Sequence, residues 1–135
     1  MKELVIPAVV ENIPLVTDFV DAELQSAGCP MKTQFQIDVV IDEIFSNICY
    51  YAYAPETGDA KVRVNVDTSS RVISLQFIDT GKPYNPLEND EPDISQELEQ
   101  REAGGLGIFL VKKSMDTVEY EFVEGQNIFS MTKNM

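Results

Sequence analysis

Two kinds of apolar spacing alternate along this chain, and neither an all-helical nor an all-strand fold can accommodate both. Apolar residues recur at every third or fourth position after Asn12, after Thr33 and after Gly105, which predicts three helices. They recur at every second position within residues 62–66 and 73–77, which predicts two half-buried strands. The expected fold class is therefore α+β.

Local residues indicate where the first of these elements begin. Residues 4–7 predict a short first strand, which should lie at an edge of the sheet because it ends in Pro7. Asn12 is expected to cap the first helix. Thr33 and Gln36 form a capping box that should open the second helix.

The rest of the chain predicts one domain over residues 1–135. A last hairpin is expected over 118–132, with its turn at 124–127. Residues 82–103 show no long apolar period, and a connection of this length in a compact domain is usually a lid or a disordered segment. We expect a lid at about 85–105. The expected architecture is a two-layer α/β sandwich in which a mixed sheet carries helices on one face.

The net charge of −13 and the absence of histidine exclude several classes of function. Binding to nucleic acid through phosphates needs clustered Lys and Arg, and so does docking on an anionic membrane. Without histidine there is no Ser-His-Asp or Cys-His machinery and no histidine phosphoacceptor. General-base chemistry would fall to a carboxylate, a lysine or a tyrosine.

Cysteine usage indicates a reducing compartment. The two cysteines, Cys29 and Cys49, match no metal-ligand spacing, and no signal peptide is recognised. No apolar stretch is long enough to span a membrane. A cytoplasmic location is therefore expected.

Glu43 and Asn47 interrupt the apolar surface of the second predicted helix. They lie four residues apart and so share one face of the helix. An amide oxygen suits Mg²⁺, which takes few protein ligands, and a carboxylate one turn earlier can accept a proton from an attacking hydroxyl. The same two residues would also fit a solvated stripe on an amphipathic helix, and the pair alone does not decide between these interpretations.

Asp79 ends a predicted strand and is followed by Thr80 and Gly81. Such an aspartate can simply cap a turn. It can also accept a hydrogen bond from the exocyclic amine of adenine, which the carbonyl of guanine cannot supply. Asp-Thr-Gly is also the catalytic triplet of aspartic proteases, but those are all-β folds and this chain predicts three helices.

Gly104, Gly105 and Gly107 open the third predicted helix. A helix start with little side-chain bulk offers free N–H groups and the positive end of the helix dipole to phosphates. A flexible hinge is the alternative interpretation. The cluster lacks the third glycine of a dinucleotide fingerprint and the Gly-Lys-Ser/Thr of a P-loop, so neither of those folds is indicated.

Together, these segments resemble the Bergerat-type ATP-binding fold shared by gyrase, the Hsp90 chaperone, histidine kinases and MutL proteins. Within that group the chain is most similar to the small anti-sigma-factor serine/threonine kinases, and the likeness covers about residues 4–133. The matching positions are Glu43 and Asn47 in a Glu-x-x-x-Asn helix, Asp79, Gly81, Pro83 and Tyr84 in an Asp-x-Gly-x-Pro-aromatic motif, residues 104–115 in the lid-to-helix passage, and, more weakly, Gln126, Asn127 and Thr132 in the closing hairpin.

The resemblance implies a site for ATP and Mg²⁺, with Asn47 holding the metal and Glu43 acting as the catalytic base. The residues implied to contact the nucleotide are Asn47, Asp79, Gly81, Pro83, Tyr84, Arg101, Gly104, Gly105, Leu106, Gly107 and Thr132. One position departs from the family, because the histidine that commonly follows the helix asparagine by four residues is Tyr51 here. Seven acids and a single base, Arg101, lie between residues 87 and 103, so Arg101 is expected to contact phosphate within the lid.

The resemblance further implies a Mg-ATP-dependent anti-sigma regulatory factor. Such a protein phosphorylates a serine or threonine on a small antagonist protein and alternately binds a sigma factor, commonly as a homodimer. Two alternatives remain open: a non-catalytic ATP-binding partner-switching module of the same fold, and an ATPase or catalytic module that acts in trans. No direct contact with nucleic acid or with a membrane is expected.

Overall fold

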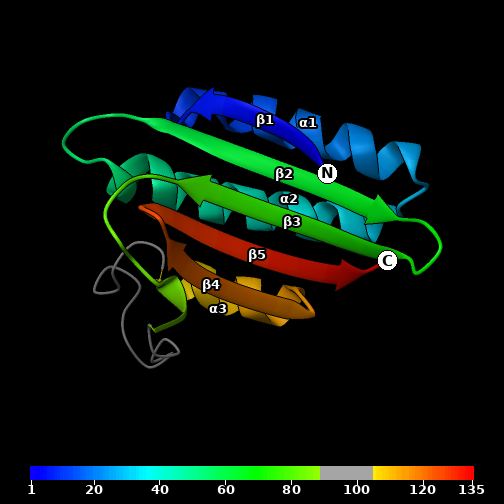
Figure 1. The fold of residues 1–135 in the computed structure, drawn as a ribbon. Coiled ribbons are helices and arrows are strands. Elements are labelled where there is room, and N and C mark those ends of the chain that lie inside the picture. Colours follow the sequence, from blue (N-terminus) through cyan, green and yellow to red (C-terminus); the bar gives the residue numbers. More distant parts are fainter. Residues whose placement is uncertain (89–104) are drawn as a thin grey trace.

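The computed structural model describes residues 1–88 and 105–135, which form a five-stranded sheet with three α-helices on one face (Figure 1). The helices are α1 (Ile13–Ser26), α2 (Met31–Asn47) and α3 (Gly105–Ser114). The strands are β1 (Lys2–Pro7), β2 (Asp59–Asp67), β3 (Val72–Asp79), β4 (Thr117–Val123) and β5 (Gln126–Asn134). Shorter helical segments are η1 (Val10–Asn12), η2 (Ile48–Ala52) and η3 (Pro86–Glu88). The α+β class and the placement of all helices on one face are confirmed.

The sheet is antiparallel throughout, so the prediction of a mixed sheet is wrong. Its strand order is β1-β2-β3-β5-β4, and each neighbouring pair is antiparallel. A single crossover helix between neighbouring strands would make them parallel. Here two successive helices, α1 and α2, return the chain to the end of the sheet at which β1 finishes, where Pro7 pairs with Asp59 of β2.

A single apolar core lies between the sheet and the helices. Alternate residues of the central strands face it, and the largest fully buried side chains are those of Phe45 on α2 and Phe77 on β3. This packing fixes the end of α2 against the end of β3. In the described residues, no helix combines the length and the apolar composition needed to cross a lipid bilayer.

Both predicted helix caps are wrong in detail. Asn12 occupies the N-cap position of α1, but its Nδ2 donates to the Pro7 carbonyl oxygen at 2.9 Å because η1 runs directly into the helix. Helix α2 begins at Met31, two residues before Thr33, because the extended backbone of Pro30 sets its start. Thr33 is consequently buried within the first turn.

The turn of the last hairpin is shorter than predicted. Glu124 and Gly125 both have positive φ (52° and 79°), and Val123 pairs directly with Gln126. Such a two-residue turn matches the right-handed twist of the strands that it joins. Asn127 therefore lies inside β5, not in the turn. Arg101, Gly104 and nearly all of the predicted lid at about 85–105 fall outside the described residues.

Two aspartates, Asp21 on α1 and Asp38 on α2, face each other between the helices. The Oδ1 atom of each is buried and has no hydrogen-bond partner among the described residues. Burial raises the pKa of Asp38 to about 7, and the neighbouring carboxyl group of Asp21 acts in the same direction. The folded protein therefore holds a proton here that the unfolded chain releases at lower pH.

We expect Asp38→Asn to stabilise the protein at pH 8 and to matter little at pH 5. When folding raises the pKa of an acid, the folded protein loses stability as the pH rises from the pKa in the unfolded chain to the pKa in the folded protein. For Asp38 this range runs from about 4 to about 7. The variant removes the charge, so its melting temperature at pH 8 should exceed that of the wild type by on the order of 5 °C. Thermal unfolding at both pH values measures this, with the exposed Asp42→Asn as control. An equal gain at pH 5 would contradict the proton-sharing interpretation.

Candidate nucleotide site

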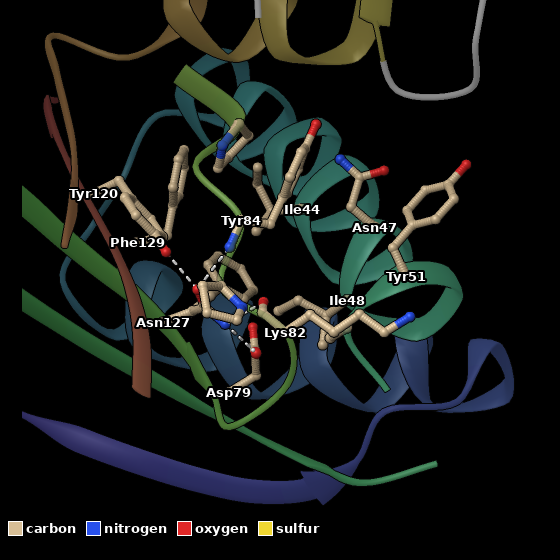
Figure 2. Close-up of a pocket in the computed structure, with 14 residues that line it drawn as sticks. Ile44, Asn47, Ile48, Tyr51, Asp79, Lys82, Tyr84, Tyr120, Asn127 and Phe129 are labelled. Atoms are coloured by element: carbon tan, nitrogen blue, oxygen red, sulfur yellow. Dashed lines mark hydrogen bonds between the residues drawn. The ribbon is translucent and has the colours of Figure 1, made fainter. Parts of the chain in front are cut away.

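A cavity of about 660 Å³ lies at the end of the sheet where β3 finishes, β5 begins and α2 continues into η2. Figure 2 shows the residues that line it. This volume lies within the range of small-molecule sites. Residues from α2 and η2 form one wall, and the sheet with the segment after β3 forms the other. The lining residues are Ile44, Asn47, Ile48, Tyr51, Ala52, Phe77, Asp79, Lys82, Pro83, Tyr84, Pro86, Tyr120, Asn127 and Phe129.

Asp79 is a buried carboxylate in this cavity, with 7% of its surface exposed. Its Oδ1 accepts hydrogen bonds from Asn127 Nδ2 and from the Gly81 backbone N–H, both at 2.9 Å. Neither of these two hydrogen bonds goes to Oδ2, which is therefore the oxygen available to a ligand among the described residues. Burial raises the pKa of Asp79, and these two hydrogen bonds oppose that rise.

Asn127 lies opposite Asp79 in the ladder between β3 and β5. Besides Asp79, its Nδ2 donates to the carbonyl oxygens of Lys82 (2.9 Å) and Gly81 (3.4 Å). Its Oδ1 accepts from the Tyr84 backbone N–H (3.2 Å) and from the Tyr120 hydroxyl (2.5 Å). Figure 2 shows this group of hydrogen bonds at the floor of the cavity. The sequence motifs gave Asn127 no role, and the only signal for it was its place in the closing hairpin.

The segment after β3 is fixed against the end of α2 and η2. The Lys82 backbone N–H donates to the Ala52 carbonyl oxygen at 2.9 Å, and the Tyr53 hydroxyl accepts from the Thr80 backbone N–H at 2.9 Å. A Cβ atom on Gly81 would overlap the backbone of Ala52. Glycine at this position is therefore required for the close approach of the two segments.

Glu43 and Asn47 lie one turn apart on α2, as their spacing predicts, and a side-chain hydrogen bond joins them. Asn47 lines the cavity (Figure 2), whereas Glu43 lies at the contact between α2 and α3. Burial raises the pKa of Glu43, and the negative charge of Asp42 adds to the effect. The hydrogen bond from Asn47 opposes both.

The first turn of α3 meets the Glu43 carboxylate directly. A Cβ atom on Gly107 would overlap the carboxylate group of Glu43. Gly105 and Leu106 precede Gly107 in the same turn, so the N-terminal end of α3, whose first N–H groups have no partner within the helix, lies next to the Glu43–Asn47 pair. Gly104 and Arg101 lie outside the described residues.

The structure brings most of the predicted residues together, but it places Thr132 elsewhere. Asn47, Asp79, Pro83 and Tyr84 line the cavity, and Gly81 contributes its backbone N–H to Asp79. Thr132 pairs with Ser74 towards the other end of β3, and its hydroxyl hydrogen-bonds that of Thr117. Thr132 does not line the cavity, where β5 presents Asn127, and the nucleotide contact implied for Thr132 stays a prediction. Cavity residues that carried no predicted contact include Lys82, Tyr120 and Phe129.

No preformed metal cage occurs in residues 1–88 and 105–135, because no three Asp, Glu or Cys side chains are grouped to hold an ion there. Mg²⁺ commonly takes one or two protein ligands and completes its shell with water and phosphate oxygens. A single amide oxygen from Asn47 at the cavity wall is compatible with that mode of binding.

We expect Gly81→Ala to lower the melting temperature much more than Gly107→Ala. The new Cβ at residue 81 would meet fixed backbone atoms of Ala52, whereas at residue 107 it would meet the end of the Glu43 side chain, which can turn away. The first change should cost about 1–3 kcal/mol, in the range of overpacked sites. Thermal unfolding of both variants tests this, and equal melting temperatures would show that the Ala52 contact is not as close as described.

Comparisons with known proteins point to one family. Residues 6–133 match the family described as the histidine kinase-like ATPase domain. The chain is 26% identical to the serine-protein kinase RsbW of Bacillus cereus over 144 residues, which cover 97% of this chain and 82% of that protein. It is 25% identical to the serine/threonine-protein kinase BtrW of Bordetella bronchiseptica over 103 residues, which cover 76% of this chain and 72% of that protein.

Solved structures with the same fold include two histidine kinases. The Acinetobacter baumannii histidine kinase AdeS superposes with a TM-score of 0.56 at 14% identity, covering 100% of this chain and 69% of AdeS. The histidine kinase domain of the Erythrobacter litoralis EL346 blue-light activated histidine kinase gives a TM-score of 0.53 at 13% identity, covering 95% of this chain and 61% of that domain. At these identities the similarity concerns the fold alone.

Proposed function

The chain belongs to the histidine kinase-like ATPase domain family, as its sequence predicts, and we propose that it is a Mg²⁺- and ATP-dependent serine/threonine protein kinase acting as an anti-sigma regulatory factor. The relatives RsbW, a serine-protein kinase by name, and BtrW, a serine/threonine-protein kinase by name, support this choice within the family. At about 25% identity they support the reaction class but do not define the substrate.

The observation that carries the proposal is the Asp79 carboxylate in the cavity. Its Oδ1 is occupied by Asn127 and Gly81, and its Oδ2 remains for a donor from a ligand. An ionised carboxylate can only accept hydrogen bonds, so it suits the exocyclic amine of adenine and not the carbonyl oxygen of guanine. The cavity of about 660 Å³ and its apolar side chains, such as Ile48 and Phe129, fit a flat base.

The phosphate end of the nucleotide would lie towards Asn47 and the start of α3. The Asn47 amide oxygen would hold Mg²⁺, and the backbone N–H groups of Gly105 to Gly107 would donate hydrogen bonds to phosphate oxygens. Mg²⁺, when bound, would offset phosphate charge that a protein of net charge −13 otherwise repels. Arg101 and Gly104 remain proposed phosphate contacts.

Glu43 is the proposed general base. Its carboxylate lies one turn before Asn47 and beside Gly107, so it borders the end of the cavity assigned to phosphate. Burial raises the pKa of Glu43, and a base works best when its pKa approaches the pH at which it operates. Glu43 would accept the hydroxyl proton of the serine or threonine that attacks the terminal phosphate.

The proposed protein partners are a small antagonist protein, which would be the phosphorylated substrate, and a sigma factor. The strong negative charge of the chain favours basic surfaces on both. A homodimer and a cytoplasmic location belong to the same proposal.

Phosphoryl transfer to the antagonist protein is the test of this function. The antagonist, expected from a neighbouring gene, would be incubated with the purified chain, labelled ATP and Mg²⁺, and the phosphorylated residue identified by mass spectrometry. Phosphoserine or phosphothreonine that depends on the chain and on Mg²⁺ is the expected result. Release of free phosphate without protein labelling would instead indicate an ATPase.

A non-catalytic ATP-binding partner-switching module is the second candidate. The observation that favours it is Tyr51, an exposed cavity residue that stands where the family commonly has histidine. Tight ATP binding that changes the affinity for the antagonist, with no phosphate transferred to it, would decide in favour of this candidate.

A further inference from the structure

We infer that Asn127, held in place by Tyr120, is a positioning residue that makes Asp79 selective for an amine-bearing base such as adenine. The inference rests on the proposed function, since it concerns the same nucleotide site. It assigns the selectivity to a side chain that the sequence matched only weakly, in the closing hairpin, and to which it gave no role in the site. Asn127 lines the cavity and is 6% exposed.

The orientation of the Asn127 amide is fixed by backbone groups that cannot exchange roles. The Tyr84 N–H can only donate, and it donates to Oδ1. The carbonyl oxygens of Gly81 and Lys82 can only accept, and both accept from Nδ2. Rotating the amide by half a turn would set donor against donor and acceptor against acceptor at these three positions.

This fixed orientation decides which oxygen of Asp79 remains available. Asn127 Nδ2 and the Gly81 N–H both donate to Oδ1, which leaves Oδ2 for a ligand. The same two donors favour the ionised form of this carboxylate and so oppose the rise in its pKa that burial causes. An ionised Asp79 accepts only, whereas a protonated Asp79 could donate to a carbonyl oxygen. Base selectivity therefore depends on the donor from Asn127.

Tyr120 extends this unit to the edge strand β4. Its hydroxyl donates to Asn127 Oδ1 at 2.5 Å, while the Tyr84 N–H donates to the same atom. Loss of the hydroxyl would leave Oδ1 with one donor and loosen the amide without removing its bond to Asp79. Tyr120→Phe should therefore act in the same direction as a change of Asn127, but more weakly.

The other titratable side chains that line the cavity are Lys82 and the tyrosines Tyr51, Tyr84 and Tyr120. Lys82 is the charged side chain among them, and Glu43 lies one turn before Asn47 on α2. Because Lys82 lines the cavity itself, the control for a loss of positive charge is Lys61→Met on the neighbouring strand β2, which leaves the hydrogen bonds of Asn127 intact.

The experiment is equilibrium binding of ATP and of GTP, each with Mg²⁺, between pH 5 and 8. It compares the wild type with Asn127→Leu, Tyr120→Phe and the control Lys61→Met. In Asn127→Leu the preference for ATP over GTP should fall about tenfold or more, and the pH below which ATP binding is lost should rise by about one unit. Tyr120→Phe should show smaller shifts of both, and Lys61→Met should keep the preference.

If Asn127 has only a structural role, Asn127→Leu should lower the affinity for ATP and for GTP equally. The ratio of the two affinities and the pH dependence of binding would then match those of the wild type. That outcome, in Asn127→Leu or in Tyr120→Phe, would overturn the inference. Tyr120→Phe keeps the test decisive if Asn127→Leu fails to fold. A wild-type protein without any preference for ATP would instead contradict the adenine site itself, so the two failures can be told apart.

Discussion

Asp79→Asn is expected to weaken ATP binding about 5- to 150-fold, which corresponds to about 1–3 kcal/mol for a mismatched buried hydrogen bond. The amide oxygen of the new side chain should take the place of Oδ1, because Asn127 Nδ2 and the Gly81 N–H both require an acceptor there. The amide nitrogen would then face the cavity and meet the adenine amine donor to donor.

The same geometry predicts that GTP is not weakened by this change. An amide N–H at the position of Oδ2 can donate to the carbonyl oxygen of guanine, so the ratio of GTP to ATP affinity should rise. Calorimetry with both nucleotides measures this, with Asp59→Asn as a matched control, because Asp59 is an exposed aspartate on the neighbouring strand β2. Unchanged ATP affinity in Asp79→Asn would remove Asp79 from the base-binding site.

The elements and the family could be predicted because each depends on short-range pattern. Three to five residues fix an apolar period, and a spacing of four puts Glu43 and Asn47 on one helical face wherever the helix lies. The direction of the strands could not be obtained this way. Whether β2 runs parallel or antiparallel to β1 depends on how α1 and α2 pack on the sheet, which no local pattern states.

The residue of β5 that lines the cavity, Asn127 and not Thr132, could not be predicted from local pattern either. Both are polar residues in the alternating segment of β5, and either could face a ligand. A two-residue turn at Glu124 and Gly125 sets the register of β5 and places Asn127 opposite Asp79. The longer turn predicted from the sequence would have removed Asn127 from the strand. The glycine at the second turn position was the signal that could have shown the shorter turn.

The helix caps illustrate how tertiary context overrides local propensity. Thr33 and Gln36 have the right spacing for a capping box, but Pro30 starts α2 earlier and Thr33 is buried against the core. The proposed contacts of Arg101 and Gly104 remain predictions that depend on the sequence alone.

Glu43→Gln is expected to bind Mg²⁺ and ATP as the wild type does and to lose about 10²- to 10⁴-fold of its rate of phosphoryl transfer, the range for removal of a general base. A glutamine keeps the size of the side chain and can still hydrogen-bond Asn47, but it cannot accept the proton. A base acts chiefly in the transition state, so the loss should be in the turnover rate and not in nucleotide affinity. By contrast, Asn47→Ala should lose Mg²⁺-dependent ATP binding.

The pH dependence of transfer gives a second measure of the same role. Glu43 must be deprotonated to act, and burial raises its pKa, so the wild-type rate should rise with pH through that raised value and then level off. This rise should be absent in Glu43→Gln. Gly107→Ala should bind ATP while transferring slowly, because its Cβ displaces the Glu43 carboxylate from its place beside α3. Wild-type transfer rates in Glu43→Gln would show that another group takes the proton, and the base would then have to be sought outside the described residues or on the substrate protein.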